Sequence, residues 1–417
     1  MHVVRGKHRR GVCAPNRQFR ILLRFCPHGS GLARHRFRYL ANLLLRLTGA
    51  RPSSSEKGAS CAVAVKRFNL VEMTNSSTLN GMPFSLIINS LQLIAWIAVL
   101  PLAAAAQPSM KAIVIHSSGG PEVLKYEDAP RPQPKDDEVL IRVMAAAVNP
   151  VDVFIREGRS NQFPLIPGMD VAGVVEQVGN KVTKFKRGDA IYAYLSFDEQ
   201  GGYAEFAVAK QDHAALKPKS IDFEQATAVP LAATTAWQAL IEKAGLTAGQ
   251  TVLIHGGSGG VGTFAVQIAK ARGAKVIATA STANQDLLKQ LGVDQPIDYT
   301  TTKFEDVVKD VDVVLNAVRG DTLARSYGVV KKGGIIVSIT GQPDPVELEK
   351  HGIRGTGLGA HPDAKVLEEL AKLIDAGKIT PIVSAVMPLI DVAKAHQQIA
   401  SRHTRGKVVL KVAEPPK

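Results

Sequence analysis

The sequence predicts an α/β fold that combines a β-rich domain with a doubly wound parallel sheet. Two patterns support this class. Between residues 111 and 230, short runs of β-forming residues are broken by glycine and proline. After residue 230, apolar strand-like runs alternate with helix-like segments, as in sheets whose strands are joined by crossover helices. The region from Met110 to Lys417 is long enough for two domains that each bury a core.

The β-rich domain is expected to be mostly antiparallel and partly barrel-like. Pro130, Pro132 and Pro134 cannot continue a hydrogen-bonded ladder, so they indicate an exposed connection between strands. The predicted strands of this domain are 113–115, 139–143, 171–178, 190–193 and 204–208.

Strands and helices alternate in the second half of the chain. Gly245, Gly273, Gly292 and Gly377 each follow a helical pattern and are typical of helix ends. The predicted strands are 252–255, 276–279, 311–315, 335–339 and 408–412, and the predicted helices are 232–244, 261–272, 284–291, 364–376 and 393–400. This alternation favours a parallel sheet that is covered by helices on both faces.

The positive charge of the chain is concentrated in residues 1–109. The net charge is +14, but these residues hold 15 Lys and Arg against only two acids, Glu56 and Glu72, so the rest of the chain is nearly neutral. A neutral body lacks the clustered basic face that binds a phosphate backbone. Nucleic acid is therefore not an expected partner.

Cysteine is confined to the same region, at Cys13, Cys26 and Cys61. The body of the protein therefore has no cysteine to serve as a nucleophile, a disulfide partner or a zinc ligand. Its histidines show no close metal-ligand spacing such as H-E-x-x-H, so we expect no metal site.

Residues 1–109 are expected to form a disordered leader, because they are rich in arginine and show little periodicity. Segment 82–106 is uncharged, and its apolar run from Leu91 to Leu102 precedes a row of alanines. This pattern resembles a signal peptide or a membrane anchor. Four interpretations stay open: a signal peptide starting at Met82, an uncleaved membrane anchor, upstream sequence included by a start codon assigned too early, and a transit peptide. Membrane contact is expected through 82–106 only.

One glycine-rich motif points to a nucleotide. It reads Gly257-Ser258-Gly259-Gly260-Val261-Gly262, follows the predicted strand 252–255 and opens the predicted helix 261–272. At such a place a G-x-G-x-x-G motif allows a tight turn and close approach to a pyrophosphate, whose charge the helix N-terminus attracts. We expect these six residues to bind a dinucleotide, the alternative being an ordinary glycine-rich turn.

The end of the next predicted strand distinguishes between dinucleotides. An NAD site usually has an acid there, about 20 residues after the glycines, which binds the ribose diol. This chain has Thr279, Ala280, Ser281 and Thr282 at that place, and no acid before Asp286. A 2′-phosphate would not be repelled, so NADPH is the expected cofactor; alternatively these hydroxyls only end a strand and cap a helix. Because the nucleotide pool is intracellular, we expect a soluble cytoplasmic body, with export or membrane tethering through 82–106 as the alternative.

From Met110 to Val412 the chain resembles the medium-chain dehydrogenase/reductases, and within them the zinc-free quinone oxidoreductase and enone reductase group. Besides the glycine motif, the resemblance rests on 147–152 (AVNPVD), 167–173 (PGMDVAG), 188–189 (GD), 202–205 (GYAE), 233–237 (ATTAW), 298–299 (DY) and 405–410 (RGKVVL). It implies a chaperonin-10-like β-rich catalytic domain at 110–231, an inserted NADP-binding Rossmann domain at 232–375 and a C-terminal return to the catalytic domain at 376–417. The active cleft would lie between the domains, and the protein would be a homodimer.

The resemblance also indicates the reaction. Where zinc alcohol dehydrogenases of the same superfamily have Gly-His-Glu, this chain has Gly168-Met169-Asp170. With no zinc ligands to support alcohol oxidation, the expected reaction is transfer of hydride from NADPH to a quinone or an α,β-unsaturated carbonyl. Two alternatives stay open, an enoyl-thioester reductase and a nucleotide-binding regulator with little turnover. The thioester reductases carry a catalytic tyrosine shortly after the Asn-Pro segment, and 151–158 contains none.

The resemblance implies roles for five single residues. Asn149 would lie beside the nicotinamide and the substrate carbonyl, and Thr235 would contact the nicotinamide. Ser281 and Tyr299 would bind the adenosine 2′-phosphate, and Lys407 would also bind the cofactor.

One departure from the family pattern concerns the 2′-phosphate. Family members often have a lysine two positions after Ser281, where this chain has Ala283. The preference for NADPH is therefore expected to be weaker than in the family, or to be supplied by another cation such as Lys289.

Enone reduction also needs a proton donor. Tyr192, Tyr194 and Tyr203 are the nearest candidates in the region expected to form the cleft, and Tyr192 is the one predicted to be catalytic with Asn149. The alternative for each tyrosine is packing with a satisfied hydroxyl. Because the catalytic tyrosine of the thioester reductases is missing, we expect solvent, or a water held by Asn149, to protonate the enolate.

Overall fold

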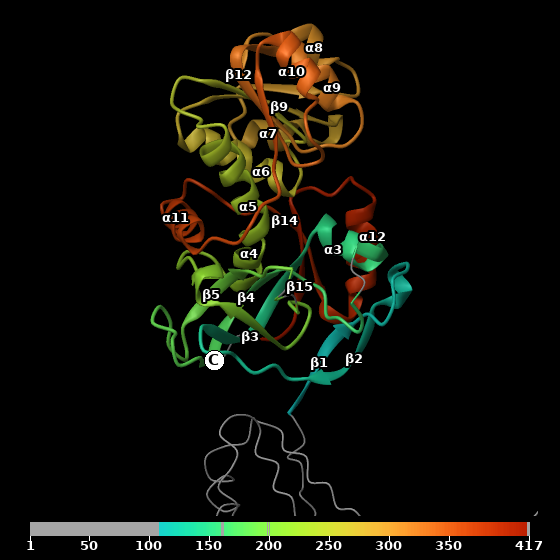
Figure 1. Cartoon of the computed structure of the whole chain (residues 1–417), viewed down its shortest axis with the longest axis vertical. Coiled ribbons are helices and arrows are strands. Elements are labelled where there is room, and N and C mark those ends of the chain that lie inside the picture. The colour runs from blue at the N-terminus through green and yellow to red at the C-terminus, as the bar shows by residue number, and fades with distance from the viewer. Residues whose placement is uncertain (1–107, 160–161, 198, 200, 415–417) are drawn as a thin grey trace, which may run out of the picture. The chain divides into compact units, whose positions relative to one another are not determined.

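The computed structural model, shown in Figure 1, describes residues 108–159, 162–197, 199 and 201–414. Segment 82–106 and nearly all of the predicted leader lie outside the described residues. Strand β1 (Ser109–Val114) begins at the last residue of that predicted leader. In the described ranges, no helix is long and apolar enough to cross a membrane.

A seven-stranded sheet is built around the long, buried strand β3 (Glu138–Val148). β3 pairs antiparallel with β4 (Asp170–Val178), β6 (Phe206–Lys210) and β15 (Lys407–Lys411), so the last strand lies directly beside β3. The other strands of this sheet are β5 (Ala190–Tyr194), β7 (Ala214–Leu216) and β14 (Val383–Pro388), and β14 pairs parallel with β15. A separate antiparallel pair joins β1 to β2 (Lys125–Pro130). The predicted β-rich, mostly antiparallel part is confirmed.

The second sheet has six parallel strands in the order β10-β9-β8-β11-β12-β13. These strands are β8 (Thr251–His255), β9 (Lys275–Ala280), β10 (Gln295–Asp298), β11 (Val311–Asn316), β12 (Val330–Ser338) and β13 (Arg354–Gly357). This is the strand order of the dinucleotide-binding fold, in which the order reverses beside the first strand. The predicted doubly wound sheet is confirmed, and its switch point lies between β8 and β11.

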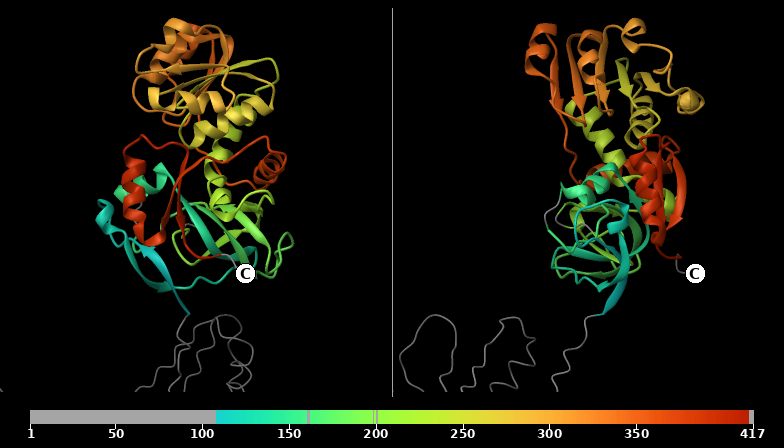
Figure 2. Two further views of the ribbon diagram at one scale, coloured as in Figure 1. Left: turned by 180° about the vertical axis from the view of Figure 1, so that it is seen from behind. Right: turned by 90° about the vertical axis from the view of Figure 1, so that its right-hand side faces the viewer.

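Both faces of the parallel sheet are buried, which explains why its central strands are continuous apolar runs. Val252 and Ile254 pack on one face with α5 (Pro230–Trp237) and α6 (Gly260–Ala271), whereas Leu253 packs on the other face with Phe304 of α8 (Phe304–Val307). Figure 2 shows helices on both sides of this sheet. Further helices are α3 (Pro150–Phe154), α4 (Phe223–Thr227), α7 (Gln285–Gln290), α9 (Thr322–Ser326), α10 (Pro345–His351), α11 (Ala364–Asp375) and α12 (Val392–Ala400).

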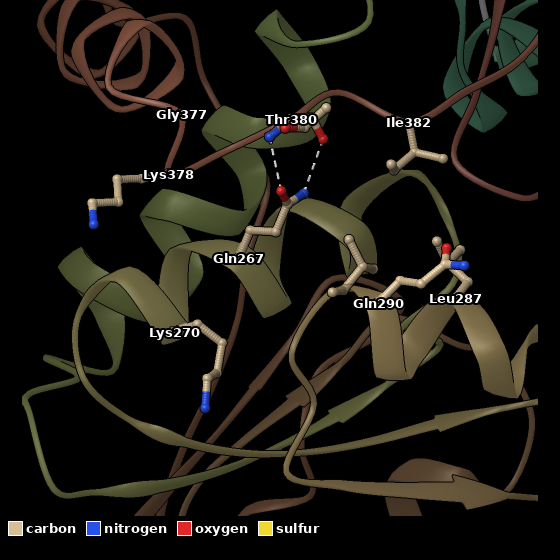
Figure 3. Close-up of a pocket in the computed structure, with 9 residues that line it drawn as sticks. Gln267, Lys270, Leu287, Gln290, Gly377, Lys378, Thr380 and Ile382 are labelled. Atoms are coloured by element: carbon tan, nitrogen blue, oxygen red, sulfur yellow. Dashed lines mark hydrogen bonds between the residues drawn. The ribbon is translucent and has the colours of Figure 1, made fainter.

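The chain passes between the two sheets twice. The first passage is α5, which continues without a break as a π-helical segment over Gln238–Lys243, so the predicted helix 232–244 is helical as far as Lys243. The second passage runs from β13 through α11 to β14. There the side chain of Gln267 in α6 accepts a hydrogen bond from the Thr380 N–H at 2.8 Å and donates one to the Thr380 carbonyl at 3.1 Å (Figure 3). The returning chain is therefore fixed to α6 before it enters the antiparallel sheet.

The two sheets use separate parts of the sequence. Strands of the parallel sheet lie within 251–357, and strands of the antiparallel sheet lie within 138–216 and 383–411. All described residues belong to one compact unit. The boundaries at residues 231 and 375 stay predictions.

Candidate active site

The glycine motif forms the turn from the carboxyl end of β8 into α6, next to the switch point of the parallel sheet. A Cβ atom on Gly262 would come within 2.0 Å of the Gly256 carbonyl oxygen. A Cβ atom on Gly257 would come within 2.8 Å of the Ala278 Cβ in β9. Gly262 is therefore required where α6 packs on the turn, and Gly257 is required where the turn packs on β9.

The N-terminus of α6 suits an anion. Its N-cap residue, Gly259, has no side chain to cap the helix, and the first turn contains no acid. The nearest atom to a Cβ on Gly259 would be the Gly256 oxygen at 3.4 Å, so a ligand can approach the backbone closely here. Backbone N–H groups and the helix dipole favour a phosphate at such an end. The turn therefore fits the pyrophosphate of a dinucleotide.

Strands β9 and β10 end side by side at the predicted 2′-phosphate site. Asp298 pairs with Ala280 in register, so Ser281 and Tyr299 follow at the same edge of the sheet. The Tyr299 N–H donates to the Ala280 carbonyl at 3.2 Å, and the residue is 56% exposed. The Ser281 hydroxyl accepts from the Asn284 side-chain amide at 3.2 Å. The structure thus brings Ser281 and Tyr299 together at one exposed edge.

A carboxylate without an expected role lies at the same edge. Asp298 accepts hydrogen bonds from the hydroxyls of Thr282 at 2.6 Å and Thr300 at 2.7 Å, and from the Thr300 N–H at 2.9 Å. The Thr282 and Thr300 hydroxyls lower the pKa of Asp298, so it is charged at neutral pH. This edge therefore carries a negative charge from Asp298 of β10, although β9 ends without an acid.

Asn149, Asp170 and Lys407 form a buried polar network at the ends of three adjacent strands. Asn149 follows β3, Asp170 begins β4 and Lys407 begins β15. The Lys407 Nζ donates to the Asn149 Oδ1 at 2.5 Å and to the Asp170 Oδ2 at 3.1 Å, and the Asn149 Nδ2 donates to the same Asp170 oxygen at 2.9 Å. Each residue is at most 3% exposed. The Asn149 amide is therefore held in one orientation.

Lys407 also connects this network to the glycine turn. Its Cδ would lie 3.2 Å from a Cβ on Gly260, the first residue of α6. The preceding residue, Gly406, donates its N–H to the Ser258 carbonyl at 2.9 Å and forms a parallel bridge with Gly259. The Lys407 side chain thus runs from the predicted phosphate site to Asn149. Its expected contact with the cofactor stays a prediction.

A second carboxyl group lies behind Asn149. The Asp152 Oδ2 accepts from the Asn149 N–H at 2.8 Å and from the Tyr203 hydroxyl at 2.9 Å. Burial raises the pKa of Asp152 to about 7 and also raises the pKa of Tyr203. The sequence motif 147–152 includes Asp152 but does not indicate a role for it. The signal that could have found it is the helix-capping pattern at the start of α3, in which an Asn is followed three positions later by an acid.

Thr235 lies on α5, and Asp170 fixes the beginning of this helix. The Asp170 Oδ1 accepts from the Leu231 N–H at 2.7 Å, and the Thr235 hydroxyl donates to the Leu231 carbonyl at 2.7 Å. Thr235 is 5% exposed. The structure therefore links Thr235 to the Asn149 network through Asp170 and Leu231.

Tyr192, the predicted proton donor, is part of the core. Its side chain is fully buried, and its hydroxyl donates to the Leu367 carbonyl in α11 at 2.5 Å. Burial raises the pKa of Tyr192 well above its usual range. Tyr194 similarly donates to the Ala360 carbonyl at 3.1 Å. This geometry argues against Tyr192 as a proton donor, because its hydroxyl is committed to packing α11 on the sheet.

Apolar side chains adjoin the Asn149 network. Ile155, Met169 and Tyr194 form a buried cluster, against which Leu165 and Leu231 pack. Met169 immediately precedes Asp170, and the Leu231 N–H is bound by Asp170, so the cluster and the network share a border. Among the residues that the structure describes, no group of three or more His, Cys, Asp or Glu side chains is arranged to hold a metal ion.

Comparisons with known proteins agree with this architecture. Residues 135–219 match the family model described as alcohol dehydrogenase GroES-like domain, and residues 291–410 match the model described as zinc-binding dehydrogenase. A quinone oxidoreductase from Sus scrofa is 37% identical over 330 residues, which cover 74% of this chain and 99% of that protein. The chloroplastic NADPH-dependent alkenal/one oxidoreductase of Arabidopsis thaliana is 39% identical over 316 residues, covering 72% of this chain and 79% of that protein.

Solved structures lead to the same family. The quinone oxidoreductase from Coxiella burnetii superposes with a TM-score of 0.69 at 35% identity and covers 73% of this chain and all of that structure. The chain belongs to the medium-chain dehydrogenase/reductases, in their zinc-free quinone oxidoreductase and enone reductase group. The expected chaperonin-10-like and Rossmann architecture is confirmed, and the site is that of an oxidoreductase with a nicotinamide cofactor.

Proposed function

We propose that this protein is an NADPH-dependent reductase that transfers hydride to a quinone or an α,β-unsaturated carbonyl compound without zinc. The proposal rests chiefly on Lys407, which packs on the first residue of α6 and holds the amide of Asn149. The phosphate-binding turn and the side chain expected beside the nicotinamide are therefore parts of one site. The names of the relatives support the reaction, since one is a quinone oxidoreductase and another an NADPH-dependent alkenal/one oxidoreductase.

The preference for NADPH is proposed from the edge formed by β9 and β10. Ser281 and Tyr299 are adjacent there and would bind the 2′-phosphate. Asp298 would weaken the preference, because its charge lies at the same edge. We therefore expect NADPH to be favoured over NADH, but not exclusively.

The bound cofactor would supply a hydride, and the protein would contribute mainly orientation. The turn at Gly257–Gly262 would hold the pyrophosphate, while Thr235 and Asn149 would face the nicotinamide. The apolar cluster of Ile155, Met169 and Tyr194 would border the acceptor and exclude water. Solvent would provide the proton that completes the reduction, because the Tyr192 hydroxyl is bound to the Leu367 carbonyl.

The test is oxidation of NADPH by the purified full-length chain with a panel of quinones and enones. NADH serves as the alternative donor, and a chelator as the control for metal. We expect turnover that prefers NADPH and does not respond to the chelator. Turnover of enoyl thioesters alone would favour the thioester reductase, and NADPH binding without turnover would favour the regulator. Strict use of NADH would contradict the roles of Ser281 and Tyr299.

The assembly and the location of the protein are proposed as well. A homodimer is implied by the resemblance alone, and sedimentation of the purified chain measures it. A cytoplasmic body is proposed because the reaction draws on the NADPH pool, and fractionation of the native host measures it. Export or tethering through segment 82–106 would be detected by the same fractionation.

A further inference from the structure

Asp152 and Tyr203 have no part in the proposed reaction, yet both are completely buried behind Asn149. The Asp152 Oδ2 accepts two hydrogen bonds, from the Asn149 N–H at 2.8 Å and from the Tyr203 hydroxyl at 2.9 Å. The other oxygen, Oδ1, has no hydrogen-bond partner within the described part of the chain. A buried carboxyl group with an unpaired oxygen is costly to stability, so its presence here calls for a functional reason.

The Tyr203 ring is fixed against the segment that leads to Asp170. A Cβ atom on Gly168 would lie 2.5 Å from the Tyr203 Cδ1, and Gly168 has a φ of +101°, so only glycine fits beneath the ring. The Tyr203 N–H donates to the Pro167 carbonyl at 3.0 Å. Tyr203 therefore ties the segment entering β4, which carries Asp170, to the turn that carries Asn149.

We propose that Asp152 and Tyr203 are positioning residues for Asn149, holding the turn after β3 so that the Asn149 amide meets Lys407 and Asp170. This inference rests on the proposed function, because it gives Asn149 its place beside the nicotinamide. The backbone of Asn149 is held by Asp152 and its side chain by Asp170 and Lys407. Loss of the hydrogen bond to the Asn149 backbone, or of those to its side chain, would let the amide rotate or shift.

The groups that face Asp152 come from several elements. Tyr203 donates to it, Asp170 at the start of β4 raises its pKa, and Lys407 at the start of β15 lowers it. Behind Tyr203, His396 of α12 contacts the tyrosine ring edge-on, with 5.8 Å between ring centres, and the pKa of His396 is lowered by burial and then by the charge of Arg156. Burial dominates and raises the pKa of Asp152 to about 7. The ionised form accepts stronger hydrogen bonds, so the turn is held more firmly as the pH rises through 7.

The test compares Asp152→Asn and Tyr203→Phe with the wild-type full-length chain, using NADPH and an acceptor that the wild type reduces. Asparagine keeps the size and one acceptor oxygen of Asp152 but cannot ionise, and phenylalanine keeps the ring packed on Gly168. Tyr327→Phe is the matched control, because the buried Tyr327 hydroxyl accepts from the Asp344 N–H at 2.6 Å in the other sheet's domain.

We expect kcat to fall about tenfold in Asp152→Asn and by less in Tyr203→Phe, with the KM for NADPH changed by no more than about twofold. The wild-type kcat should rise with pH through an inflection near 7, which Asp152→Asn lacks. The Tyr203 hydroxyl lowers the pKa of Asp152 in the wild type, so Tyr203→Phe, which lacks this hydroxyl, should move the inflection to higher pH. The double variant should lose no more than Asp152→Asn alone, since both residues act through one contact.

The positioning role would be overturned if Asp152→Asn and Tyr203→Phe had the same kcat as Tyr327→Phe. It would also be overturned if both variants kept the wild-type inflection in the pH dependence of kcat. The same conclusion would follow if activity fell only in step with the folded fraction measured by thermal unfolding. A wild-type chain that binds NADPH but reduces no acceptor would overturn the proposed function itself, and the positioning role with it.

Discussion

Replacement of Lys407 by methionine tests the network that joins the two halves of the site. Methionine keeps the apolar stem beside Gly260 but removes the ammonium group, which leaves Asp170 buried without its partner. The two charges lie 3.1 Å apart, which corresponds to about 5 kcal/mol at an effective dielectric constant of about 20. Removal of one member of a buried pair typically costs about 3–5 kcal/mol. We therefore expect Lys407→Met to lose about 3–5 kcal/mol of folding free energy, and most of its activity.

Urea unfolding followed by tryptophan fluorescence measures this loss, since Trp237 lies on α5, whose first turn is bound by Asp170. The matched variant is Lys407→Met combined with Asp170→Asn, which also removes the stranded carboxylate. We expect the double variant to be more stable than Lys407→Met alone. A single variant as stable as the wild type, or a double variant that is less stable than the single, would refute the account of this network.

Four further predictions concern single residues. Gly262→Ala should lose most NADPH binding in a fluorescence titration, because its Cβ would meet the Gly256 oxygen at 2.0 Å, whereas Gly359→Ala, with open space around it, should bind normally. Asp298→Asn should lower the KM for NADPH more than the KM for NADH, because Asp298, whose pKa is lowered, carries a charge that opposes a 2′-phosphate. Steady-state kinetics in which both KM values change by the same factor would contradict this. Burial lowers the pKa of His396 to about 3 from 6.5, so the stability that neutral His396 contributes is present above pH 6.5 and is lost as the pH falls. Between neutral pH and about pH 5, the free energy of unfolding of His396→Leu, from melting curves, should therefore fall by about 2 kcal/mol less than that of the wild type. Tyr192→Phe should lower the melting temperature and leave kcat unchanged, and a large fall in kcat would restore Tyr192 as the proton donor.

Local sequence patterns predict the centre of the parallel sheet and the glycine turn. β8, β9, β11 and β12 are apolar runs because helices cover both faces of the sheet. The edge strands β10 and β13 are not predicted, since β10 contains Pro296 and β13 contains two glycines. Each of them pairs with a neighbour on one side only, and an edge position tolerates such residues.

The polar network cannot be predicted from local pattern. Lys407 is separated from Asn149 by 258 residues and from Asp170 by 237, and only the sheet order β15-β3-β4 brings the three together. The resemblance singles out Asn149 and Lys407 but does not pair them. Asp298 belongs to the motif at 298–299, but its place beside the end of β9 follows only from the pairing of β9 with β10, which no local pattern reveals.

The most direct test of the proposed hydride transfer uses NADPH in which both C4 hydrogens of the nicotinamide are replaced by deuterium, with an enone that the full-length chain reduces. The account predicts a product with one deuterium on the former β-carbon and a proton from solvent on the neighbouring carbon. It also predicts that the chelator leaves the label unchanged. A product without the label, or NADPH that binds and is not oxidised by any acceptor, would contradict hydride transfer from NADPH to the acceptor.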